Sequence, residues 1–159
     1  MGLRTEQINR YAEGAAVLDE TLRKYPLQMW RYKPAENSWS IHEIILHLAD
    51  SEVSSYMRLR KLVAENGSTL NHHDPDTWAS EIDYHAQSAD DALALIRLIR
   101  KANAQLMRTL PEQIWATHAV VHPDRDSITL DDWMDLYIDH LHAHLQQMER
   151  VYRHWKSQD

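Results

Sequence analysis

The chain contains no cysteine. Disulfide bonds, thiolate nucleophiles, iron–sulfur clusters and cysteine-type zinc sites are therefore excluded together, and thiol chemistry would need a thiol from another molecule. Long apolar runs are also absent, because none approaches the roughly 18 residues that a membrane-spanning helix requires. The opening residues MGLRTEQINRYAEG lack the basic and then apolar pattern of a secretory signal. We expect a cytoplasmic protein that does not bind membranes.

Positive charge is scarce as well. The chain has 17 Lys and Arg against 24 Asp and Glu, for a formal net charge of −7. Affinity for nucleic acids comes mainly from clustered Lys and Arg, so a nucleic-acid partner is not expected. Glycine is rare, with 3 residues, and phenylalanine is absent, whereas 6 Trp and 7 Tyr supply large aromatic rings with polar atoms. Such rings suit pocket rims and interfaces.

Four stretches have apolar residues at the helical period of 3.6, namely 4–25, 40–65, 88–109 and 129–156. The second opens on the capping-box pattern Ser40-Ile41-His42-Glu43, and the fourth opens on Thr129 followed by two Asp residues. WATHAVV, at 115–121, is expected as a short extended piece rather than as part of a sheet. The sequence predicts a single all-α domain over residues 1–159, a four-helix bundle, whose long 66–87 connection allows a crossover between parallel helices without requiring one.

The fourth predicted helix carries three histidines within five residues. Because each residue turns by about 100° around a helix axis, His140 and His144 fall within the apolar stripe and His142 falls on the polar face. Two histidines at i and i+4 are close enough to bind one metal ion. The same pair also fits histidines at the core edge that are satisfied by hydrogen bonds.

A third ligand would have to come from another helix, and His47 of the second predicted helix is the candidate. His47 lies on the flank of that helix's apolar stripe together with Ser51 and Ser54. On geometry alone His47 is as compatible with an exposed side chain as with a ligand. The small hydroxyls beside it predict an opening lined by Ser51, with Trp39 at its rim, unless this flank simply faces solvent.

Several known site patterns are missing. HLHAH shares the outer spacing of the zincin motif, but Leu141 occupies the place of its glutamate base. No glutamate is followed by histidine three residues later, which di-iron carboxylate bundles require. No G-x-S-x-G turn marks a serine nucleophile. The sequence therefore identifies no catalytic acid or base.

NSWSIHEIILHLADSE (37–52) and ITLDDWMDLYIDHLHAHLQQMERV (128–151) together resemble the DinB/YfiT-like superfamily. The shared features are Trp39-Ser40 before the second helix, His47-Leu48 within it, His140 and His144 in the fourth helix, and the Gln147-to-Arg150 tail. The resemblance implies a four-helix bundle in up-down-down-up order, often dimeric, with His47, His140 and His144 on one divalent ion. The other histidines have no counterpart and are expected on the surface or in loops: His42, His72, His73, His85, His118, His122, His142 and His154.

Characterised members of that superfamily include transferases and isomerases that use low-molecular-weight thiols. The resemblance therefore implies a metal-dependent enzyme that activates a thiol or water against a small electrophilic substrate, as a transferase or a hydrolase. Zinc or nickel is expected first, and iron or manganese after them. The alternative is a non-catalytic, metal-binding or dimerising bundle with a closed set of four ligands, for which Asp50 or Glu52 is the candidate fourth.

Overall fold

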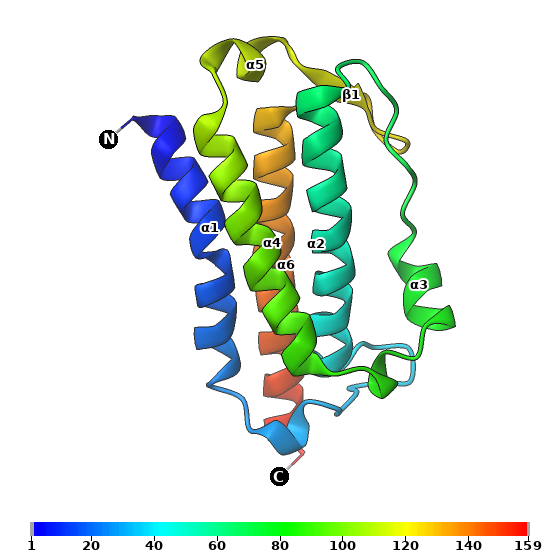
Figure 1. Ribbon diagram of the computed structural model, residues 1–159. Coiled ribbons are helices and arrows are strands. Elements are labelled where there is room, and N and C mark those ends of the chain that lie inside the picture. Colours follow the sequence, from blue (N-terminus) through cyan, green and yellow to red (C-terminus); the bar gives the residue numbers. More distant parts are fainter. Residues whose placement is uncertain (1, 159) are drawn as a thin grey trace.

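Four long helices dominate the computed structural model, which describes residues 2–158. They are α1 (Leu3–Leu22), α2 (Ile41–Ala64), α4 (Ala89–Thr109) and α6 (Leu130–Lys156). Helix α1 packs against α4 and α6, and α2 packs against the same two helices. In Figure 1 the sequence colours show α1 and α6 running in one direction and α2 and α4 in the other. The predicted four-helix bundle and its up-down-down-up order are confirmed.

Local sequence signals explain where α2 and α6 begin. The Ser40 hydroxyl accepts a hydrogen bond from the Glu43 amide at 3.2 Å, and the Glu43 carboxylate accepts one from the Ser40 amide at 2.7 Å. Thr129 and Asp132 form the same reciprocal pair at the start of α6. Each capping box satisfies two amides that a helix leaves without partners. These caps fix where the two helices that carry the clustered histidines begin.

The connection from α2 to α4 runs back along the outside of α2, so it is the crossover that parallel neighbours need (Figure 1). It contains helix α3 (Pro75–Glu81) and the 3₁₀ turn η2 (Tyr84–Ala86). The Asp74 side chain accepts from the amides of Asp76 and Thr77, and Pro75 occupies the first helical position. Asp74 and Pro75 thus start helix α3 as its N-cap and its first helical residue.

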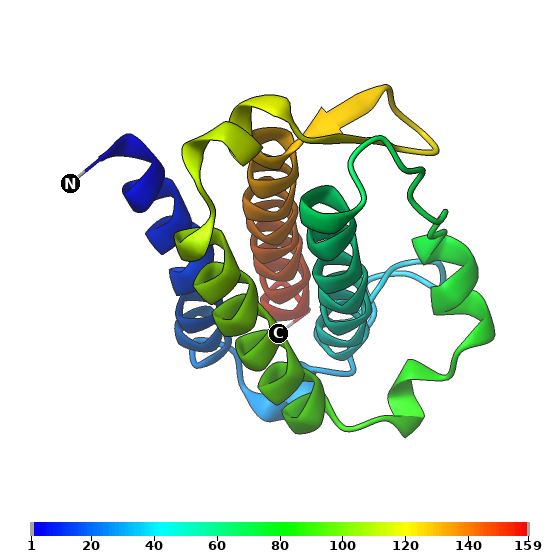
Figure 2. The ribbon, with the colours of Figure 1, turned by 45° about the horizontal axis from the view of Figure 1, so that its top comes forward.

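The end of the bundle where α6 begins is closed by α5 (Glu112–Thr117) and a hairpin of β1 (Ala119–Val121) and β2 (Ser127–Thr129) (Figure 2). The strands are antiparallel, with Val120 opposite Ile128. The expectation of an extended piece without a sheet was therefore wrong. Both paired side chains are buried against the bundle, which stabilises a hairpin too short to be stable alone. The other connection, from α1 to α2, contains the 3₁₀ turn η1 (Leu27–Met29).

The apolar core forms two clusters, one toward each end of the bundle. Between them on the helices lie buried polar residues, chiefly Glu52 of α2 with Arg100 and Asn103 of α4. Arg100 needs space next to α1, where a Cβ on Gly14 would collide with its guanidinium and lie 2.8 Å from a Leu141 methyl. Among residues 2–158 no helix combines the length and apolar character of a membrane span.

Candidate metal centre

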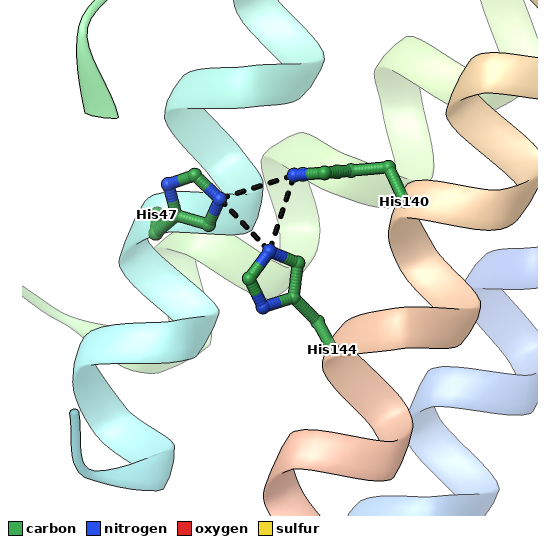
Figure 3. Close-up of side chains that lie close together, drawn as sticks. All are labelled: His47, His140 and His144. Atoms are coloured by element: carbon green, nitrogen blue, oxygen red, sulfur yellow. Dashed lines mark hydrogen bonds between the residues drawn. The ribbon is translucent and has the colours of Figure 1, made fainter. Parts of the chain in front are cut away.

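Three histidines from two helices converge on one point between α2 and α6. Figure 3 shows His47 reaching from α2 toward His140 and His144 of α6. The Nε2 atom of His47 lies 3.1 Å from that of His140 and 3.0 Å from that of His144, and the two α6 nitrogens are 3.1 Å apart. The structure thus brings together the three histidines that the sequence analysis considered as ligands of one ion.

Helix geometry explains which histidines take part. His140 and His144 are one turn apart on the face of α6 that packs against α2, whereas His142 is exposed and contacts Gln146 on the other side. His47 is only 3% exposed, so the alternative of an exposed His47 is wrong. Its ring packs 4.8 Å from that of Trp39, which also stacks on His144 at 6.2 Å. Trp39 therefore holds two of the three imidazoles.

The three rings are neutral near pH 7. Burial lowers the pKa of His47 from 6.5 to about 2, with the neighbouring His144 and His140 adding to the shift. Burial likewise lowers the pKa of His140 to about 3, and it lowers that of His144. Loss of hydration disfavours the charged imidazolium in each case. A neutral imidazole has one nitrogen with a free lone pair, which is the form that binds metals.

A contact behind His144 determines which nitrogen that is. The Gln147 Oε1 atom lies 2.8 Å from Nδ1 of His144, so it accepts the Nδ1 proton and leaves the lone pair on Nε2. That lone pair points at two other imidazole nitrogens, an arrangement that a cation between them would satisfy. Bonds of about 2.1 Å at angles of about 90–110° separate ligand nitrogens by about 3.0–3.4 Å. The donor set and its spacing fit a divalent ion.

Neither carboxylate considered as a fourth ligand reaches the cluster. Asp50 accepts a 2.6 Å hydrogen bond from the Tyr84 hydroxyl, and Glu52 is paired with Arg100. The group of close ligand atoms found in residues 2–158 contains His47, His140 and His144 alone. The protein thus offers three imidazoles and no carboxylate to an ion.

Two hollows adjoin the histidines. The first, of about 240 Å³, includes His47, Ser51 and His140 in its lining, together with Arg58 and Tyr137. The second, of about 590 Å³, includes Trp39, His144 and Gln147. Ser51 and Trp39 were expected at one opening, but the structure places them in different hollows on either side of the cluster. Ser54 borders neither of the two.

Two histidines expected on the surface or in loops are buried. His42 is 6% exposed, and its Nε2 lies 2.9 Å from the Tyr84 carbonyl and 3.1 Å from that of Gln87, which anchors the crossover to α2. His122 is 7% exposed and lines the smaller hollow. Both are covered by segments distant in sequence, so helix periodicity gave no signal for their burial.

Arg58 and Tyr137 are residues of the smaller hollow that sequence reasoning missed. Arg58 follows His47 by eleven positions and Ser51 by seven, so it continues the same flank of α2. Tyr137 is one turn before His140 on α6, and their ring centroids are 6.5 Å apart. Helical spacing from His47 and His140 was the signal that could have found them.

Comparison with known proteins gives concordant results. The protein "Putative metal-dependent hydrolase YfiT" of Bacillus subtilis is 28% identical over 119 residues, which cover 74% of this chain and 66% of YfiT. "Putative metal-dependent hydrolase OB0782" of Oceanobacillus iheyensis is 31% identical over 108 residues, covering 67% of this chain. That match spans 61% of OB0782, so the alignments extend over less than two thirds of either relative.

The solved structure of Bacillus subtilis YfiT, described as "a probable metal-dependent hydrolase with an unusual four-helix bundle topology", has a TM-score of 0.87 to this fold. The two are 23% identical, and the superposition covers 98% of this chain and 90% of that one. This likeness supports the fold. The model of the DinB superfamily matches residues 10–148, which include all four long helices in whole or in large part. The chain therefore belongs to the DinB superfamily.

Proposed function

We propose that this protein is a metal-dependent enzyme in which His47, His140 and His144 hold one divalent ion that acts on a small electrophilic substrate. The observation that carries the proposal is the convergence of three imidazole Nε2 atoms within 3.0–3.1 Å of one another in a buried seam. Such a geometry points three imidazole nitrogens at one position, and a cation there would accept an electron pair from each of them. The names of the relatives from Bacillus subtilis and Oceanobacillus iheyensis support metal dependence.

The chain's own residues prepare the site in three ways. Burial keeps the imidazoles neutral, so their lone pairs are available at neutral pH. Gln147 fixes the proton of His144 on Nδ1, and Trp39 packs on His47 and His144 and limits their rotation. With no protein carboxylate in the cluster, His47, His140 and His144 would leave a bound ion accessible to a water or a thiol. When bound, the ion would lower the pKa of that water or thiol and so supply a nucleophile near pH 7.

The reaction is either hydrolysis or transfer to a thiol. Since the chain has no cysteine, a transferase would take its thiol from a low-molecular-weight compound. Zinc and nickel are the first candidates for the ion, followed by iron and manganese. The non-catalytic alternative requires a closed set of four protein ligands, and the two candidate carboxylates are engaged elsewhere.

The metal content of freshly purified protein tests the proposal. We expect about one divalent ion per chain by elemental analysis of the native sequence. The His140→Ala variant should lose the ion because two imidazoles hold it weakly. His142→Ala is the matched control, because it removes an exposed histidine of the same helix that points away from the site. Equally low metal in native protein and the His140→Ala variant would refute the proposed centre.

A second assay separates the two reaction types. Metal-loaded protein is incubated with activated esters and with alkylating electrophiles, each with and without low-molecular-weight thiols. Consumption of substrate without thiol indicates a hydrolase, whereas a strict requirement for thiol and formation of a thioether indicates a transferase.

A further inference from the structure

Arg58 lies in the smaller hollow without a carboxylate partner. Its Nη1 atom is 3.3 Å from Nε2 of His122 and 3.4 Å from the Tyr137 hydroxyl, and Nη2 donates to the Asn71 carbonyl at 3.3 Å. These contacts are long for a guanidinium, which forms its strong hydrogen bonds with anions at about 2.7–2.9 Å. No ion pair to Arg58 occurs within residues 2–158, in contrast to the buried Arg100, which is paired with Glu52. Arg58 is thus a half-buried cation with unused binding capacity.

The contact between Arg58 and His122 brings two hydrogen-bond donors together. The Asp124 amide donates to Nδ1 of His122 at 3.2 Å, so the proton of the neutral ring must be on Nε2. That Nε2–H group and the Arg58 guanidinium then face each other as donors. An acceptor placed between them would satisfy both.

The rest of the lining adds one unsatisfied polar atom and one further cation. The Nε2 atom of His73 is buried and has no partner, and Arg125 also borders the hollow. Asp124 is the one acidic residue of the lining, and its carboxylate lies at the surface, 3.3 Å from His72. The hollow therefore suits a ligand group that is negatively charged and rich in acceptors.

Helix directions place this donor cluster next to the histidines. Side chains lean toward the N-terminus of their own helix, so Arg58 leans back along α2 toward Ser51 and His47. On α6, Tyr137 is one turn from His140. All five residues line the same hollow. A ligand group held by Arg58 thus shares a small space with the open side of the candidate metal centre.

We propose that Arg58, with the Tyr137 hydroxyl and His122 Nε2–H, binds the carboxylate of a small organic acid whose other end reaches His47, His140 and His144. The proposal rests on the proposed function, and it adds the substrate class. A planar guanidinium matches a carboxylate in shape and charge. The volume of about 240 Å³ is below the usual range of about 300–1,000 Å³ for drug-sized ligands, so the acid must be short.

Binding of short thiols to cobalt-loaded protein tests the subsite, because a thiolate on Co²⁺ gives a charge-transfer absorption band that reports occupancy. The probes are mercaptoacetate and 3-mercaptopropionate, each compared with its uncharged amide. In the native protein we expect at least one acid to bind about 10-fold or more tightly than its amide. Arg58→Gln should abolish that preference while leaving the affinity of the amides unchanged, and Arg58→Lys should restore part of it.

Arg150→Gln is the matched control, because it removes the same charge from the other hollow beside His144. It should leave the preference intact. Equal affinity of acid and amide in native protein would overturn the proposal, as would a preference that persists in Arg58→Gln, which would indicate chelation by cobalt alone. Loss of the preference in Arg150→Gln would place the carboxylate in the larger hollow and also overturn it. Thermal unfolding confirms that each variant is folded.

A metal-independent readout separates this subsite from the metal centre. Propionate titrated into metal-free protein should shift the guanidinium ¹⁵N resonances of Arg58, and propionamide should not. If cobalt fails to bind while propionate shifts Arg58, the metal-dependent function is wrong and the anion subsite stands. If propionate leaves Arg58 unmoved, the subsite is refuted. Inorganic phosphate should displace the bound acid less than propionate does at equal concentration, and stronger displacement would overturn the assignment to a carboxylate.

Discussion

Two polar clusters are buried in the middle of this bundle, and they differ in how their hydrogen-bonding groups are satisfied. In the first, the Arg100 guanidinium donates to Glu52 at 2.7 Å and to the backbone carbonyls of Tyr11 and Tyr137 at 3.0 and 2.9 Å. Asn103 links the Tyr11 and Ser55 hydroxyls at 3.1 and 3.2 Å. In the histidine cluster, three Nε2 atoms face one another, His144 Nε2 carries a lone pair, and Nδ1 of His47 has no partner.

The two clusters offset the desolvation cost of burial in different ways. Glu52 and Arg100 are 2% and 1% exposed and form an ion pair in which each provides the counter-charge of the other. The histidines instead give up their charge, as the lowered pKa values show, and keep unshared electron pairs. The first cluster is satisfied within the protein, whereas in the second the lone pair of His144 faces two other imidazoles, where a cation would satisfy it. The first cluster is therefore structural, and the second is the metal centre proposed above.

Removing Arg100 should cause the largest loss of stability among these predictions, because it leaves the Glu52 carboxylate buried without a partner. We expect Arg100→Met to lower the free energy of unfolding by about 3–5 kcal/mol in urea denaturation followed by circular dichroism. The double variant Glu52→Gln with Arg100→Met should recover part of the loss, since no buried charge remains. Metal affinity should be retained in whichever variant folds. A loss below about 1 kcal/mol for Arg100→Met would contradict the structural assignment.

The second-largest effect should be a loss of stability at acid pH that the histidine cluster causes. In metal-free protein the folded-state pKa of His47 is about 2 and that of His140 is about 3, whereas an unfolded histidine has a pKa of about 6.5. As the pH falls below 6.5 the unfolded chain takes up protons that the folded chain does not, so the free energy of unfolding decreases. The slope is about 1.4 kcal/mol per pH unit for each histidine.

His47→Leu should reduce that slope between pH 6 and pH 4, measured by urea denaturation at each pH. His142→Leu serves as its control, because His142 is exposed and lies outside the cluster. Identical slopes for the native protein and His47→Leu would show that His47 is not held neutral by burial.

The smallest of these effects concerns Gln147. Gln147→Met removes the acceptor for Nδ1–H of His144, and we expect about 10-fold weaker metal binding in competition with a chromophoric zinc indicator. Gln146→Met is the matched control, because Gln146 contacts the exposed His142. If both variants bind metal as tightly as the native protein, the Gln147 contact does not support the site.

Residues whose behaviour depends on their own helix were predictable from the sequence. The capping boxes at Ser40 and Thr129 and the opposite directions of His142 and His144 follow from helix geometry within one segment. His47 was a candidate third ligand from its place on the flank of its helix. Its pairing with the α6 histidines was decided by the resemblance to a family, because helix periodicity cannot say which helices are neighbours. On periodicity alone His47 remained as compatible with solvent as with the cluster.

Features that depend on contacts between distant segments were not predictable. The burial of His42 and His122, the hairpin and the place of Arg58 all depend on how the crossover and the β1–β2 turn cover α2 and α6. Glu52 was considered as a metal ligand, but Arg100 of another helix binds it instead. Space for that guanidinium depends on Gly14 of a third helix, so no single segment contains the information.

His47 and His140 are 93 positions apart in the chain, which has a consequence for the order of folding and metal capture. Bringing such distant residues together in an unfolded chain requires closing a very large loop. The entropy lost on that closure opposes a folding pathway that begins with metal binding. We therefore expect the bundle to assemble first, stabilised by its own core and by the Arg100 ion pair. The proposed ion would then enter the folded protein through the hollows beside the histidines, so that metal supply would limit the proposed activity rather than folding.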